Sequence, residues 1–87
     1  EVFFTSTVLQ HNSDDTLDRI FGNAKIVKPA GFQFLLYENS QVTAPHVKAR
    51  CVDDHVDLIS RHFRVKEFSS DSHVVHGQRH DISVIEV

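Results

Sequence analysis

The stretch DDTLDRI at residues 14–20 and the stretch DDHVDLI at residues 53–59 decide the fold that we expect for this chain. Each begins with two aspartates, which favour the start of a helix because carboxylates there cap free amides and complement the helix dipole. Each continues with apolar residues three or four positions apart, as on the buried side of an amphipathic helix. The two stretches therefore predict two short helices, each packed by one side onto a sheet.

Segments typical of β-strands flank both predicted helices. Phe, Thr and Val are frequent in residues 2–10, and residues 32–37 are strongly apolar. Residues 46–52 alternate between apolar and basic side chains, which is the period of a half-buried strand. Gly22 and Asn23 predict the end of the first helix. Further strands are predicted at residues 25–28, 64–68, 74–75 and 81–87, the last two forming a hairpin.

The order of these predicted elements is similar in the two halves of the chain. In each half a strand precedes the helix and further strands follow it, which predicts two modules of the β-α-β-β type. A chance likeness is the alternative, because aspartates before an amphipathic turn are common. In both cases we expect a single domain over residues 1–87 with an α+β fold. Its sheet is mostly antiparallel with both helices on one face, either ferredoxin-like or as a compact paired-module fold.

Composition limits the class of protein. The 87 residues are 40% hydrophobic and 24% charged, as in an ordinary globular domain, and no apolar run is long enough to span a bilayer. The net charge of −3 makes nucleic acid an unexpected partner. Cys51 is the only cysteine, which favours a reducing, cytoplasmic location. Because so short a chain buries only a small core, we expect a homodimer.

The segment AGFQFLLY at residues 30–37 resembles the aromatic strand of the RNA-recognition motif, and VFFTST at residues 2–7 stands for its partner strand. The resemblance implies that Phe32 and Phe34 stack on bases. Ala30 replaces the basic residue of that motif, and burial of the two rings in the core is the alternative. An RNA- or protein-binding sandwich without catalysis is therefore the second hypothesis for function.

The stretch PHVKARCVDDHVDLISRHFRVKEF at residues 45–68, followed by HGQRHDISVIEV at residues 76–87, resembles the second module of the vicinal oxygen chelate superfamily. That superfamily includes glyoxalase I and the bleomycin-resistance proteins, and its metalloenzymes chelate a divalent metal. The resemblance implies His46, Glu38 and Glu86 as metal ligands here. A binder without a cofactor is the alternative, because the first strand carries no ligand. The resemblance implies small-molecule binding, or a minimal lyase or isomerase, and leaves open whether the chain is an enzyme.

Basic side chains supply the binding site that we expect. His46, Lys48 and Arg50 lie on one side of the predicted strand at residues 46–52, opposite its apolar side chains. Because the apolar side should meet the helices, the basic side faces either solvent or a ligand cavity. A small anionic or oxygen-rich ligand would bind there through charge-assisted hydrogen bonds. Tyr37 is the further binding candidate.

Overall fold

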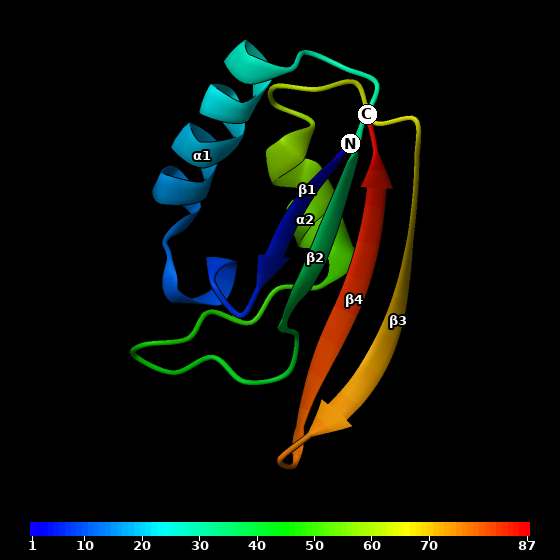
Figure 1. Cartoon of the computed structure of the whole chain (residues 1–87). Helices are drawn as coiled ribbons and strands as arrows, with labels where there is room; N and C mark the ends of the chain where they lie inside the picture. The colour runs from blue at the N-terminus through cyan, green and yellow to red at the C-terminus, as the bar shows by residue number, and fades with distance from the viewer.

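The computed structural model describes residues 1–87 as two helices on a four-stranded sheet (Figure 1). In chain order the elements are β1 (Val2–Ser6), the short 3-10 helix η1 (Leu9–His11), α1 (Asp14–Val27), β2 (Gln33–Asn39), α2 (Val52–Ile59), β3 (Glu67–Val75) and β4 (Gln78–Glu86). The strand order is β1-β2-β4-β3, with β1 parallel to β2 and the other two pairs antiparallel. The predicted α+β class with a mostly antiparallel sheet is therefore confirmed.

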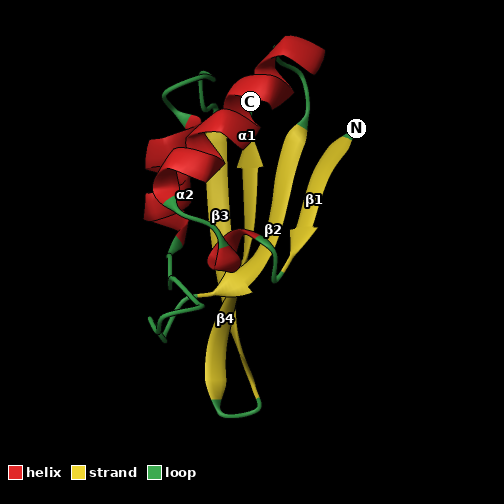
Figure 2. Ribbon diagram, turned by 90° about the vertical axis from the view of Figure 1, so that its left-hand side faces the viewer, coloured by secondary structure: helices red, strands yellow, loops and turns green.

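Both helices lie on one face of the sheet, as predicted, and the other face carries none (Figure 2). A cluster of 11 buried apolar residues fills the space between helices and sheet. At its centre Phe34 of β2 has no exposed surface. Its ring contacts Phe3, Phe21 and Phe63, so this cluster ties β1, β2, α1 and the segment after α2 together. Neither helix has the length and apolar character needed to cross a membrane.

Helix α1 begins where the sequence predicts and ends later. The Ser13 side chain caps it by accepting a hydrogen bond from the Thr16 amide at 3.2 Å. The helix continues through Gly22 to Val27, so the predicted end at Gly22 and the predicted strand at residues 25–28 are wrong. A Cβ added to Gly22 would lie 3.2 Å from Cε1 of His62. Glycine thus stands there because another side chain packs closely, not because the helix ends.

The predicted strand at residues 46–52 is wrong, because the chain from β2 to α2 is a loop up to residue 51. The Lys48 amide donates to the Gln10 carbonyl at 2.7 Å, and the Arg50 amide donates to the Asn39 carbonyl at 3.1 Å. These bonds hold the loop against η1 and the end of β2, away from any strand ladder. Neither half of the chain therefore contains a full four-element module: the first is β1-α1-β2 and the second is α2-β3-β4.

The predicted hairpin near the C-terminus is confirmed and is longer than expected. Its turn is formed by His76 and Gly77, with φ values of 51° and 76°. Two successive positive φ angles suit the tight turn between twisted antiparallel strands. The predicted strand at residues 64–68 begins only at Glu67, and the predicted loop after it is part of the same strand, β3. The hairpin of β3 and β4 extends past the helices at the lower end of Figure 1.

Candidate functional site

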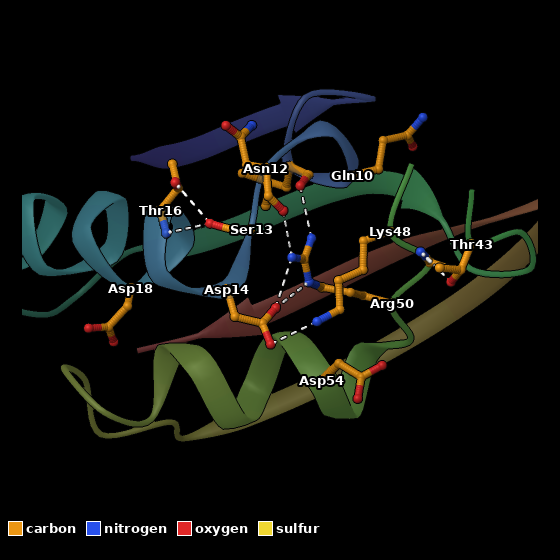
Figure 3. Close-up of polar contacts among 12 residues, drawn as sticks. Gln10, Asn12, Ser13, Asp14, Thr16, Asp18, Thr43, Lys48, Arg50 and Asp54 are labelled. Carbon is orange, nitrogen blue, oxygen red and sulfur yellow. Dashed lines mark hydrogen bonds and ion pairs between the residues drawn. The ribbon is translucent and has the colours of Figure 1, made fainter. Parts of the chain in front are cut away.

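Arg50 lies inside the protein, and only 2% of its side chain is exposed. Its guanidinium donates to the carbonyl of Leu9 at 2.8 Å and to that of Asn12 at 2.7 Å. It also pairs with the Asp14 carboxylate at 2.8 Å (Figure 3). These bonds join the loop before α2 to η1 and to the first turn of α1. Arg50 is therefore a structural link and does not face a ligand cavity on the sheet.

The other two basic residues also lie elsewhere than predicted. The Lys48 ammonium binds the second oxygen of Asp14 at 2.9 Å, and the hydrogen bonds from Lys48 and Arg50 lower the pKa of that carboxyl. His46 is exposed in the loop, and its carbonyl accepts a hydrogen bond from His11 Nδ1 at 2.7 Å. The predicted cationic sheet face is therefore wrong. Small-molecule binding stays a prediction, and the groove that Lys48 and Arg50 help to line lies beside α2 and not on the sheet.

The three implied metal ligands lie in different environments. The Glu38 carboxylate is buried on the helix side of the sheet, where it accepts hydrogen bonds from the Thr5 hydroxyl at 2.7 Å and the Gln10 amide at 3.1 Å. Glu86 lies on the opposite face of the sheet, next to buried Ile85, and His46 lies in the loop. The structure does not bring them together, and no three His, Cys, Asp or Glu side chains gather as a metal site would require.

The aromatic residues divide between the two faces of the sheet. Phe32 and Phe34 are buried in the core, so their rings are not available for stacking on bases. The predicted alternative, core packing, is confirmed for both. Tyr37 lies on the face without helices, where its ring stacks on His80 with centroids 5.2 Å apart. Of the four predicted binding residues, Tyr37 alone lies on the uncovered sheet face.

His55 of α2 is a buried histidine that has no hydrogen-bond partner at either ring nitrogen. Burial, assisted by the charge of nearby Arg50, lowers the pKa of His55 to about 4. The ring is therefore neutral at pH 7 and behaves as a core residue. None of the grooves on the protein is lined by this side chain.

Strand β1 forms one edge of the sheet, and its outer side pairs with nothing. The Thr7 amide donates to the Tyr37 carbonyl at 2.8 Å, which shows the phase of the ladder between β1 and β2. Alternate residues of a strand bond to the neighbour on each side. The backbone amides and carbonyls that point away from β2 are therefore those of Val2, Phe4 and Ser6. Except for the Ser6 carbonyl, which accepts from the Thr7 hydroxyl at 2.8 Å, they form a row of free donors and acceptors at β-strand spacing.

An apolar groove of about 450 Å³ lies at the N-terminal end of this edge, between the start of β1 and the C-terminal half of α1. Helix α1 extends past β1 in Figure 1, so part of its underside covers no strand. The apolar residues of the groove are Val2, Phe3, Ile20, Ala24, Val27 and Phe32. The start of β1 therefore has open apolar space beside it, next to α1. Sequence reasoning missed this feature, although VFFTS at residues 2–6 lacks the charge or proline that usually protects an edge.

No protein-family model matches this chain, and no curated protein or solved structure matches it at a significant level. The resemblances to the vicinal oxygen chelate superfamily and to the RNA-recognition motif therefore stay predictions. The surfaces of the molecule provide the remaining information about function. Among them, the edge of β1 combines unpaired backbone groups with an apolar groove.

Proposed function

We propose that this domain binds an extended segment of a partner protein, which adds a fifth strand to the sheet at β1. The observation that supports the proposal is the combination of an unpaired strand edge with an apolar groove beside it. Addition of a strand to an exposed edge is a common mode of peptide recognition, in which the backbone gives affinity and pockets for alternate side chains give specificity.

The chemistry of the edge favours an extended chain over a helix or a small molecule. The free amides of Val2, Phe4 and Ser6 and the free carbonyls of Val2 and Phe4 repeat every second residue, and only another extended backbone matches that spacing. Every second side chain of the added strand would enter the groove and contact Ile20 and Ala24. We therefore expect a partner segment with apolar residues at alternate positions.

The opposite edge of the sheet is a poorer site for the same interaction. Strand β3 is exposed along its whole length and carries Glu67 and Asp71. No groove of the protein is lined by β3. An added strand there would find hydrogen-bonding groups without a pocket for its side chains, so β1 is the preferred edge.

Selection from a library of 12-residue peptides displayed on phage tests the proposal. Selected peptides should alternate apolar and polar residues and should bind the Ser6→Ala variant like the wild type. Ser6→Pro removes one outward amide and leaves the ladder to β2 intact, because the Ser6 amide does not bond to β2. Peptide binding should weaken about tenfold in Ser6→Pro, as expected for one lost hydrogen bond. Ala24→Lys, which places a charge in the groove, should weaken binding further.

Hydrogen exchange measured with a selected peptide locates its site. The amides of Val2, Phe4 and Ser6 should exchange more slowly in the complex, while those of β3 should not change. Failure of the library to yield a binder contradicts the proposal. Equal binding to Ser6→Pro and Ser6→Ala, or protection of β3 in place of β1, also contradicts it.

We also propose that the chain forms a homodimer, since a core of 11 apolar residues is small. The edge of β1 is not suited to a second copy. Because α1 extends past β1 (Figure 1), two copies joined edge to edge would bring their α1 helices into the same space. A dimer therefore requires a different surface of the molecule.

A further inference from the structure

The face of the sheet without helices has an apolar centre. Leu35 and Tyr37 of β2 lie there beside Val84 and Ile82 of β4, with Leu35 paired to Val84 and Tyr37 paired to Ile82. Phe4 of β1 extends the patch, since it pairs with Leu35 and is 62% exposed. These five side chains on three neighbouring strands form one continuous surface, the sheet-face patch.

A patch of this kind is unusual on a solvated sheet. A sheet with one face in water alternates apolar residues toward the core with polar residues toward solvent. At the centre of β2 and β4 this alternation is lost, because Leu36 and Ile85 are buried beneath the helices while Leu35 and Val84 lie on the other face. Central strands that are apolar on both faces are typical of sheets covered on both sides.

Charged residues border the patch at both ends, and the two ends differ. At one end Glu67 of β3 pairs with Glu86 of β4, and at the other His73 pairs with His80. Along β2 and β4 the uncovered face therefore reads as an acidic row, two apolar rows and a histidine row. On β3 the two apolar rows end in Ser69, opposite Val84, and in Asp71, opposite Ile82. This order lets the face complement itself when it is turned by half a revolution.

We infer that the sheet-face patch is the interface of a homodimer in which two sheets pack face to face. The two-fold axis lies between the sheets and perpendicular to the strands, midway between the two apolar rows. That rotation places Leu35 against the Tyr37 of a second copy and Val84 against its Ile82. It also places the acidic row of one copy over the histidine row of the other, so Glu67 meets the second copy's His73. The contact is isologous and closes at two chains.

This inference rests on the proposed self-association and is independent of peptide binding at β1. Sedimentation equilibrium of the full chain is the first test, with the wild type expected to dimerise at micromolar concentration. Val84→Glu and Leu35→Lys each place a charge in the patch, and both should shift the chain to monomer. Val74→Glu is the matched control, because Val74 is an exposed apolar residue of β3 on the helix side. That variant should remain dimeric, and circular dichroism checks that all variants stay folded.

A charge exchange tests the orientation of the two copies. His73→Glu would place a glutamate opposite Glu67 of the other copy and should weaken the dimer. The two-fold symmetry makes this contact occur twice in the dimer. We therefore expect the two exposed like-charge contacts to raise the dissociation constant about tenfold. Adding Glu67→Lys to the same chain should restore wild-type affinity. The two residues lie at opposite ends of β3, so rescue requires a contact between copies.

The outcomes separate the interface from dimerisation itself. A chain that is still monomeric at about 10⁻⁴ M, the range of weak association, contradicts both the dimer and its interface. A dimer that persists in Val84→Glu and Leu35→Lys shows that another surface is used and overturns the inference alone. Failure of Glu67→Lys to rescue His73→Glu overturns the proposed orientation. A Ser6→Pro variant that loses peptide binding but still dimerises would agree with this inference.

Discussion

Replacement of Arg50 by alanine should destabilise the fold, because the buried guanidinium donates to two backbone carbonyls, of which only that of Leu9 has another donor, the Asn12 amide at 3.0 Å. The carbonyls of Leu9 and Asn12 would each lose a charged donor at 2.8 and 2.7 Å. A buried polar group without its partner costs about 1–3 kcal/mol. Asp14 would keep Lys48 and is about half exposed, so its carboxylate adds little. Together these effects should lower the free energy of unfolding by about 3 kcal/mol, which is near the lower end of the range for breaking a buried ion pair.

The matched control is Lys48→Ala, which removes a second cation from the same carboxylate. The Lys48 side chain is 51% exposed, and water can replace it. An exposed ion pair contributes about 0.5 kcal/mol or less. The contrast between Arg50→Ala and Lys48→Ala therefore separates burial from charge, since both variants remove one positive charge beside Asp14.

Urea unfolding followed by circular dichroism measures both effects. A domain of this size has a free energy of unfolding of about 4–13 kcal/mol, so Arg50→Ala should remain folded in water with a much lower midpoint. With a slope of about 1 kcal/mol per molar urea, the midpoint should fall by about 3 M. An Arg50→Ala midpoint within about 0.5 M of that of Lys48→Ala, which corresponds to about 0.5 kcal/mol, would refute the structural role assigned to Arg50.

Three further predictions concern the core and its titration. His55 binds a proton below about pH 6.5 in the unfolded chain but only below about 4 in the folded one. Stability from the neutral ring is thus complete above the unfolded pKa and lost as pH falls through the folded pKa, by about 3 kcal/mol. Urea midpoints at pH 7 and 4.5 should differ less in His55→Phe than in the wild type, and an equal difference would exclude His55 as the cause. Gly22→Ala should stabilise α1 by about 1 kcal/mol in a His62→Ala background. With His62 present the gain should be clearly smaller, because the new Cβ would meet the His62 ring. A double-mutant cycle measured by thermal unfolding that shows no coupling between the two positions would contradict this packing. Phe34→Ala should lower the free energy of unfolding by about 3–5 kcal/mol. Because this ring is buried, an electrophoretic assay of the wild type should detect no binding of single-stranded RNA through Phe34.

The sequence by itself determined where two helices form and on which side they are buried, but not where α1 ends. The aspartate pairs and the apolar spacing after them predict α1 and α2 correctly, because capping and helical periodicity are local properties. The hairpin near Gly77 was also readable, since a tight turn needs residues that accept positive φ. The α+β class follows from these elements, as two one-sided helices require a sheet to cover.

Only the tertiary structure decided where Arg50 points. Alternation at residues 46–52 is a valid strand signal, but a strand forms only where a partner ladder exists. Here the carbonyls at the end of η1 and the carboxylate of Asp14 bind the guanidinium, and the loop follows that anchor. The predicted sheet face is wrong for this reason, because its three basic residues share a face only in a strand, while ligand binding by these residues stays a prediction.

The surfaces that carry the proposals were also decided by tertiary structure. The VFFTS strand reads the same whether it lies at the centre or at the edge of a sheet, and its edge position follows from the strand order β1-β2-β4-β3. Leu35 and Val84 read as core residues, since an apolar strand is normally buried on both faces. Which apolar face lacks a covering layer depends on where the helices pack, and contacts between residues distant in sequence determine that packing.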